Sequence, residues 1–469
     1  MKAERIITEP FEFLQITGCE IRKAVNEHGC ALLRGYIPHD KEESYLAAAC
    51  GQTEVRIRAV SEDGEEKTIY CGIPEDMRIM HENALCLMEL RIVPYTYLMD
   101  LNPVRRCFQI PEMTYREVLD NIVGGYPGGY ALMNAGEGAV IGEPVVQYQE
   151  TDWEFIKRLA SHFHTVAVPA FTMPGAKLYF GTARQEGAVK LTASVRSVQK
   201  RIDEFLYKEE NRVEGLMEED CIVYVVESRE LLETGSQAEI GERRFYVARS
   251  ESRLDGHQLI NSYHLKREGG LKVPRAYNEK IIGASLDGRV TEVRADVVRV
   301  SLTADAKGGA GKWFPFSTVY SSPDGSGWYC MPEPGDEIRL YFPTEREKHG
   351  YVVSAVHLPV DGENPGGCRC DPSHKTIRTS SGKVVELTQD SILLDGGNGM
   401  KILLSDVSGI SIDSPMGVYI KSGSAIDISS LNEKVEIAGA AGVNIVQKES
   451  SVQITGGNVI YNNANAKVQ

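Results

Sequence analysis

The sequence lacks any run of about 20 consecutive apolar residues, the length that a membrane-spanning helix needs. Its first ten residues are charged and lack the apolar core, roughly 7–15 residues long, of a secretory signal peptide. Both absences indicate a chain that is made and folded in the cytoplasm.

Clustered positive charge is also missing. The 66 acidic residues outnumber the 51 basic ones, which gives a formal net charge of -15. Nucleic-acid binding requires lysine and arginine gathered on one surface, so we expect no nucleic-acid partner. The negative charge instead favours the solubility of a large assembly.

Familiar catalytic motifs are missing as well. The chain contains no Gly-x-Ser-x-Gly, no His-Glu-x-x-His and no P-loop. Together with the repeats described below, this indicates a structural protein that is not an enzyme and needs no cofactor.

The ten cysteines are scattered, and most stand in apolar surroundings, such as Cys86 between two leucines. In the cytoplasm such thiols stay reduced and pack as small hydrophobic side chains. Cys368, Cys370 and the nearby His374 form the one candidate metal site, particularly if three copies met on an axis. Because Cys-x-Cys with one nearby histidine is a weak signal, we expect no bound metal.

The pattern of apolar residues divides the chain, and a length of 469 residues predicts two to four domains. Alternating residues, with a hairpin over 20–36, predict strands over 1–98, and a similar pattern returns over 166–275. Between them, residues 99–165 have a helical period, with helices predicted to begin at Asn102, Thr114 and Thr151. We expect one domain over 1–275, made of two barrel-like units with helices.

Short strands with glycine-rich connections follow. They predict a small Greek-key barrel of the OB type over 276–360, although a fifth strand could not be placed. Residues 361–384 are then expected to form a neck or linker.

From about residue 385, pairs of apolar residues recur, and from Ile402 onward the step between them is eight or nine positions. Their first members include Ile402, Ile410, Val418, Ile426, Val435, Val443 and Val452. So short a period marks a β-solenoid. One chain cannot enclose the eighteen paired side chains, whereas three chains around one axis can bury them, a gross gain of about 30–50 kcal/mol per chain. We therefore expect a triple-stranded β-helix spike over 385–469. A single-chain right-handed β-helix is the alternative, but its coils are longer.

Residues 147–160 resemble the hub signature of VgrG and phage late-control D proteins, Gln-Tyr-x-Glu-Ser/Thr-Asp-x-x-Phe-x-x-Arg-Leu-Ala. The matching residues are Gln147, Tyr148, Glu150, Asp152, Phe155, Arg158 and Leu159. The OB-like region and residues 376–385, which resemble the segment entering the spike, follow in the family's order. The expected fold is therefore mainly β with some α: tandem hub barrels with helices, an OB barrel and an intertwined trimeric β-helix.

The resemblance implies a homotrimeric baseplate hub and membrane-puncturing spike of a contractile injection system: a phage tail, a tailocin or a type VI-like machine. Its expected partners are the hexameric tail-tube protein, other baseplate proteins and the target cell envelope, toward which the particle expels it. Two departures matter: the chain has no room for a lysozyme domain before residue 385, and its end has no His-x-His tip. A separate PAAR-type tip protein is therefore expected at the β-helix end.

Some residues also permit a chemical interpretation. Glu150 and Asp152 could act as paired carboxylates, but their place in the signature favours capping and subunit contacts. His162 and His164 could be ligands, although the resemblance implies no site there, and Trp313 and Trp328 fit barrel packing better than sugar stacking. The rival functions are a glycan-degrading or receptor-binding tail β-helix protein. A glycan-degrading site would need two carboxylates about 5–9.5 Å apart.

Overall fold

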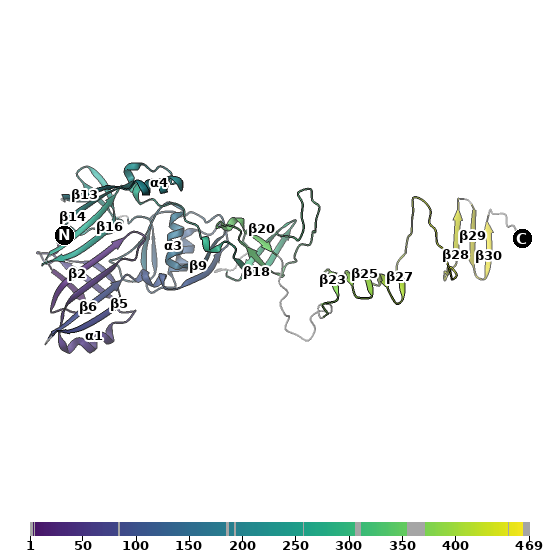
Figure 1. The fold of residues 1–469 in the computed structure, drawn as a ribbon, viewed down its shortest axis with the longest axis horizontal. Coiled ribbons are helices and arrows are strands. Elements are labelled where there is room, and N and C mark those ends of the chain that lie inside the picture. Colours follow the sequence, from purple (N-terminus) through teal and green to yellow (C-terminus); the bar gives the residue numbers. More distant parts are fainter. Residues whose placement is uncertain are drawn as a thin grey trace. The chain divides into compact units, whose positions relative to one another are not determined.

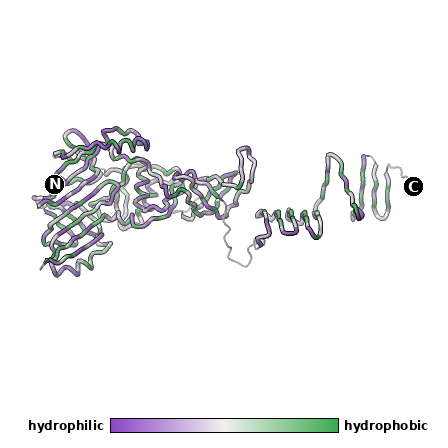
Figure 2. Tube along the Cα trace, viewed as in Figure 1, coloured by the Kyte–Doolittle hydropathy of each residue, from purple (hydrophilic) through white to green (hydrophobic). Residues whose placement is uncertain are grey.

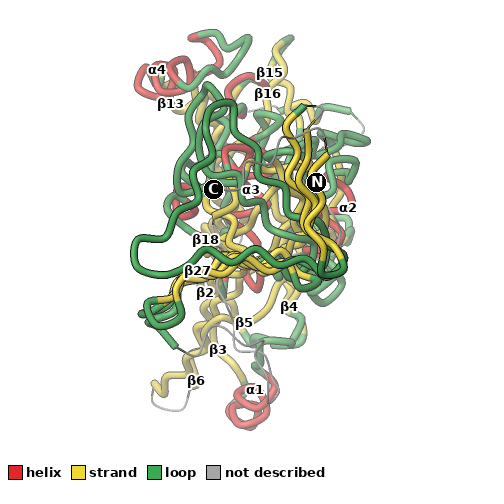
Figure 3. The backbone as a smooth tube through the Cα atoms, turned by 90° about the vertical axis from the view of Figure 1, so that its right-hand side faces the viewer, coloured by secondary structure: helices red, strands yellow, loops and turns green. Residues whose placement is uncertain are grey.

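The computed structural model describes residues 3, 5–82, 85–183, 187–191, 194–256, 258–304, 311–353, 371–448 and 450–462. Contacts within the chain divide it into two units, Met1–His357 (unit 1) and Leu358–Gln469 (unit 2). Strands and loops dominate and helices are few (Figure 3), so the mainly β prediction is confirmed. Among the described residues, no helix is long and apolar enough to cross a membrane.

Unit 1 is built on a 12-stranded sheet (Figure 1). Ten strands follow one path, β1-β4-β5-β6-β3-β2-β16-β17-β14-β13, while β15 pairs with β16 and β12 pairs with β15. The strands are β1 Arg5–Glu9, β2 Gln15–Ala24, β3 Cys30–Ile37, β4 Val55–Val60, β5 Glu66–Glu82, β6 Leu85–Val93, β12 Val189–Lys190, β13 Ser194–Lys200, β14 Ile222–Ser228, β15 Gln237–Ile240, β16 Arg243–Asp255 and β17 Gln258–Lys266.

The two strand regions expected as separate barrel-like units join in this one sheet. Strand β2 pairs with β16 antiparallel, with Ile21 opposite Ser252. The outer edge of β2 would otherwise leave unpaired backbone donors and acceptors, and β16 satisfies them. Each half keeps its own apolar cluster, one around Leu33 and Ile57 and another around Val226 and Phe245. Closure of either half into a barrel stays a prediction.

The predicted helices at Thr114 and Thr151 are present, as α2 Tyr115–Val123 and α3 Asp152–Ser161. Each begins with a capping box, in which the threonine hydroxyl accepts from the backbone N–H of a glutamate three residues on. Helices α1 Glu42–Ala48 and α4 Ile202–Glu210 complete the set, with short 3-10 turns η1 His39–Lys41, η2 Tyr95–Asp100, η3 Glu218–Cys221, η4 Glu268–Leu271, η5 Glu279–Ile281 and η6 Glu347–His349.

The prediction of a helix beginning at Asn102 was wrong. Residues Pro103–Phe108 form strand β7, which pairs antiparallel with β9, Val145–Thr151. Proline is compatible with the first residue of a strand because it lacks only a backbone donor there. Strand β9 lies some forty residues further along the chain, and its hydrogen bonds with β7 outweigh the local preference for a helix.

Two smaller sheets complete unit 1. Strands β10 Ala167–Pro169, β11 Lys177–Phe180 and β8 Tyr130–Met133 form a three-stranded sheet that shares a core with α2 and α3. The OB-like region forms a five-stranded sheet in the order β20-β19-β18-β21-β22. Its strands are β18 Ser285–Arg294, β19 Val297–Leu302, β20 Trp313–Pro315, β21 Glu337–Tyr341 and β22 Tyr351–Val353, so β20 is the strand that the sequence left unplaced.

Unit 2 consists of two antiparallel meanders. The first contains β23 Lys375–Arg378, β24 Val384–Leu387, β25 Ser391–Gly397, β26 Met400–Ser405 and β27 Gly409–Asp413. The second contains β28 Val443–Gln447, β29 Ser450–Thr455 and β30 Asn458–Asn462, and residues 414–442 between them contain no strand. A lone chain pairs each strand with its sequence neighbour, so these meanders are not the predicted intertwined β-helix, which needs three chains.

Candidate functional site

The signature residues lie where strand β9 runs into helix α3. Gln147, Tyr148 and Glu150 belong to the strand, and Asp152 is the first residue of the helix. Thr151 caps α3 between them, so the turn from strand to helix fixes the position of both carboxylates. Gln147, Glu150, Asp152 and Arg158 are all buried although each is polar or charged.

Arg158 lies at the centre of a buried charge cluster. Its Nε and Nη2 donate to the Glu150 carboxylate at 2.8–3.2 Å, and its Nη1 donates to Glu347 Oε1 at 3.0 Å. Nη2 also donates to the carbonyl oxygen of Val146 at 2.7 Å. Because Glu347 follows the OB-like strand β21, the guanidinium ties the hub helix to the OB-like region. We call Glu150, Arg158 and Glu347 the signature charge cluster.

Asp152 is held by a second set of donors. Its Oδ1 accepts from Gln147 Nε2 at 2.8 Å, while its Oδ2 accepts from Tyr126 Oη at 2.7 Å and from Arg106 Nη2 at 3.1 Å. These partners come from β7, β9 and the segment after α2. The carboxylate therefore fixes three parts of the hub around the start of α3.

The apolar signature residues belong to two different apolar clusters, that of the hub helices and that of the OB-like region. Phe155 and Leu159 are fully buried, and the Phe155 ring stacks on Phe108 with centroids 6.1 Å apart. Tyr148 is half-buried against the OB-like core, and its carbonyl oxygen accepts from Asn278 Nδ2 at 2.8 Å. The signature thus joins the hub core to the OB-like core.

Burial dominates the electrostatics of the cluster. It raises the pKa of Glu150 in spite of Arg158, which favours the charged carboxylate. Both oxygens of Glu150 and of Asp152 are occupied by internal donors. The carboxylates of Glu150 and Asp152 therefore stabilise the fold. Neither has an oxygen without an internal donor, so the two do not form a pair available for acid–base catalysis.

His162 and His164 lie at the end of α3, as expected. His162 Nδ1 lies 2.7 Å from the Tyr115 hydroxyl, and His164 Nδ1 lies 2.9 Å from the Val273 carbonyl oxygen. Burial, aided by Arg275 and Arg158, lowers the pKa of His162 to about 3, so the ring is neutral at physiological pH. His162 lines a cavity of about 330 Å³ between the hub and the OB-like region, together with Tyr115, Arg275, Arg346 and Glu347.

The repeated apolar pairs of unit 2 meet as cross-strand neighbours. One row runs through Val385, Leu394, Ile402 and Ile412, and the other through Leu387, Ile392, Leu404 and Ile410. We call these eight residues the apolar ladder. The second meander repeats the arrangement, with Val443 opposite Ile454 and Ile445 opposite Val452. Figure 2 shows hydrophobic segments along the strands of both meanders.

The apolar ladder is exposed in a single chain. Its members other than Val385 keep between 38% and 74% of their accessible surface, with Ile410 the most exposed. The paired residues between the meanders, Val418, Ile426 and Val435, are exposed as well. A large apolar face on a folded chain marks an interaction surface.

The other candidates divide as follows. Cys368 and Cys370 lie outside the described residues, and His374 lies 3.6 Å from carboxylate oxygens of Asp371 and Glu386. Trp313 lies on β20 beneath Arg299, and Trp328 is more than half exposed. Neither tryptophan belongs to the OB-like apolar cluster, in which Phe314 is the buried aromatic residue of β20, so their role in barrel packing stays a prediction.

Sequence reasoning missed the partners of the signature. Glu347 is 189 residues from Arg158, and Arg106 and Tyr126 lie in segments that carry no motif. A buried cation needs an anion, so the available signal was that Arg158 stands next to apolar residues on the buried face of its helix, with Glu150 shortly before it in the sequence.

The comparisons with known proteins bear on the region that contains the signature. Residues 44–163 match the phage tail baseplate hub (GPD) family. None of the curated proteins matches the chain.

Solved structures share the fold at low identity. One is the E. coli c3393 protein, described as a component of the type VI secretion system with structural similarity to the T4 bacteriophage tail proteins gp27 and gp5. It has a TM-score of 0.53 and 12% identity, and the match covers 74% of this chain and 99% of that chain. The half-lidded Francisella PdpA–VgrG complex gives a TM-score of 0.50 and 8% identity over 87% of each chain. The resemblance to VgrG and baseplate hub proteins is confirmed.

Proposed function

We propose that this chain, whose residues 44–163 match the phage tail baseplate hub family, is the structural hub and membrane-puncturing spike of a contractile injection system. The observation that carries the proposal is the exposed apolar ladder of unit 2, which follows a hub signature in the same chain. The machine is a phage tail, a tailocin or a type VI-like system.

The ladder supports a homotrimer. Both of its rows belong to strands whose apolar face a single chain leaves in water. Three chains wound around one axis would turn these faces toward one another as a triple-stranded β-helix over 385–469 and would remove the sheet edges along the rod. Each chain also contributes two strand-rich hub halves, so three chains would offer six to a hexameric tail tube.

The signature charge cluster supports a mechanical role. It joins the hub to the OB-like region through buried, charge-assisted hydrogen bonds rather than through a mobile linker. Such a joint would pass force from a contracting sheath through the hub to the spike. The proposed β-barrel closure of the OB-like region is supported by the bridge between Phe316 and Val352, at the two edges of its sheet.

The remaining partners follow from this role. The chain would assemble in the cytoplasm with the tail tube and other baseplate proteins, carry a PAAR-type tip protein at the end of the β-helix, and be expelled toward the target cell envelope. It would act without catalysis and without a catalytic cofactor, and the engagement of Glu150 and Asp152 by internal donors supports the absence of acid–base chemistry at the signature.

Light scattering on the purified full-length chain tests the proposal. We expect a mass of about 155 kDa, three times 51.8 kDa. The variant Ile410→Asp, which places a charge in the ladder, should dissociate the trimer. The matched control Val407→Asp changes a residue that is 87% exposed and lies outside the ladder, and it should leave the mass unchanged.

A monomeric wild-type chain, or equal dissociation by the two variants, would contradict the proposal. Release of soluble sugar from purified cell envelopes by the trimer would instead favour a glycan-degrading tail protein.

A further inference from the structure

Four chemically reactive side chains gather at one end of the hub sheet, outside the signature. Strand β6 lies between β3 and β5, with Cys86 opposite Ile37 on one side and opposite His81 on the other. His39 follows β3 by two residues and starts η1, and Glu42 starts α1 directly after it. The sheet register therefore brings together two short-range pairs, His39 with Glu42 and His81 with Cys86.

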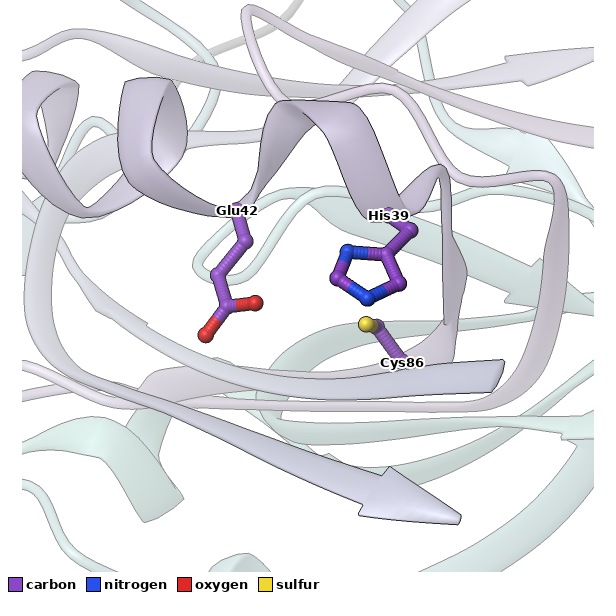
Figure 4. A group of neighbouring side chains, drawn as sticks. All are labelled: His39, Glu42 and Cys86. Atoms are coloured by element: carbon purple, nitrogen blue, oxygen red, sulfur yellow. The ribbon is translucent and has the colours of Figure 1, made fainter. Parts of the chain in front are cut away.

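The distances within this group are short. The Cys86 sulfur lies 3.6 Å from His81 Nδ1, and His81 Nε2 lies 3.2 Å from Glu42 Oε1. One possible ligand atom from each of His39, Glu42 and Cys86 lies within 4.8 Å of the others. Figure 4 shows the Glu42 carboxylate, the His39 ring and the Cys86 sulfur gathered beneath the short helical segment.

The solvent exposure of the four side chains differs across the group. Cys86 is 1% exposed and belongs to the apolar cluster of the hub, Glu42 is half-buried, and His39 and His81 are exposed. The sulfur thus lies at the edge of the core, whereas the imidazoles face solvent, from which an ion can reach the group.

We propose that His39, Glu42 and Cys86 bind one zinc ion, and that His81, whose Nδ1 lies 3.6 Å from the Cys86 sulfur, supplies the fourth ligand through that nitrogen. A thiolate, two imidazoles and a carboxylate are the ligand types that zinc takes in four-coordinate tetrahedral sites. With bond lengths of about 2.0–2.3 Å, tetrahedral ligand atoms lie roughly 3.3–3.7 Å apart, so the ligand atoms of His39, Glu42 and Cys86, which lie within 4.8 Å of one another, draw together as the ion binds. The His39 and His81 ring centroids, 6.0 Å apart, are near the separation of two imidazoles on one ion.

The zinc ion has a structural role in the hub and not a catalytic one. All four positions belong to the protein, which leaves no open site for substrate and is typical of structural zinc. The ion ties the η1–α1 segment, through His39 and Glu42, to the ends of β5 and β6, which are themselves paired in the sheet. The expected role of Cys86 as a small hydrophobic residue is then incomplete, because its thiolate is also a ligand.

The test uses untagged full-length protein, since a histidine tag binds zinc itself. The protein is stripped with a chelator, loaded with zinc chloride, passed through gel filtration and analysed by mass spectrometry for metal. We expect about one zinc per chain. Cobalt loading should give a thiolate-to-metal charge-transfer band, and binding of either metal should weaken as the pH falls, because the ligands must be deprotonated.

Matched variants separate the site from general damage. Cys86→Ser should abolish the cobalt–thiolate band and weaken zinc binding at least about 10-fold, whereas Cys19→Ser, at an equally buried cysteine of the same apolar cluster, should keep both. His39→Gln changes an exposed residue, so it should weaken binding with unchanged circular dichroism. Wild-type protein that retains less than about 0.1 zinc per chain, or a cobalt band that survives Cys86→Ser, would overturn the proposal.

Discussion

Removal of Arg158 is the sharpest perturbation of the hub that the structure suggests. In Arg158→Met, the carboxylates of Glu150 and Glu347 lose their shared cation, and the Val146 carbonyl oxygen loses its donor. Methionine matches the length of the arginine stem, so the change in packing is small. Breaking a buried pair by removing one partner costs about 3–5 kcal/mol of folding free energy.

Urea unfolding of the full-length chain measures this cost. The three tryptophans, at positions 153, 313 and 328, all lie in unit 1, so their fluorescence reports on the unit that contains the cluster. The control is Arg289→Met, which removes an exposed ion pair with Glu337. Exposed pairs contribute about 0–1 kcal/mol, so the control should shift the unfolding midpoint little.

The pH dependence of the cost has a definite sign. Burial raises the pKa of Glu150 in the folded chain, and removal of Arg158 raises it further. A raised carboxyl pKa means that the folded state favours the protonated form. The cost of Arg158→Met should therefore be smallest in acid and grow as the pH rises through the folded-state pKa.

The double variant Glu150→Gln/Arg158→Met checks the physical cause, because it removes one buried charge together with the cation. It should be more stable than Arg158→Met alone at neutral pH. The reasoning is refuted if Arg158→Met costs no more than Arg289→Met, or if the two substitutions at Glu150 and Arg158 simply add.

Three further outcomes are expected. Ile410→Asp should convert the trimer to monomers in light scattering, because each chain would bury a charge in place of an apolar side chain that a single chain leaves 74% exposed. Thr151→Ala should destabilise unit 1 by about 1 kcal/mol in urea, because α3 loses its N-cap; a change below about 0.3 kcal/mol would show that the cap is dispensable. His162 has its folded-state pKa lowered from 6.5 to about 3, so stability should fall by about 5 kcal/mol as the pH drops from 6.5 toward 3. His162→Gln should flatten that slope of unfolding free energy against pH, and an unchanged slope would contradict the assignment.

Local signals in the sequence were sufficient for several elements. The threonine–glutamate spacing at Thr114 and at Thr151 predicted two helices, because a capping box acts within one turn. Alternating residues around a turn predicted the β2–β3 hairpin for the same reason. The regular apolar pairs of the C-terminal region reappear as the rows of the ladder, since their spacing sets which residues share a face.

Contacts between residues far apart in the sequence could not be predicted from the sequence. The helix expected at Asn102 is strand β7 because β9 supplies its hydrogen bonds. Nothing near Arg158 indicates Glu347, and nothing near His39 indicates Cys86, because each pairing exists only after strands have taken their places in a sheet.

The sequence by itself therefore determined the mainly β composition, the hub signature and the repeating apolar pairs, all of which rest on spacings of a few residues. Only the tertiary structure decided that the two strand regions of the hub share one sheet, that the signature arginine reaches the OB-like region, and that four ligand-type side chains meet at the end of β6. The physical reason is that spacing along the chain fixes which face a side chain takes, whereas its neighbour across the sheet is fixed by how the whole chain closes on itself.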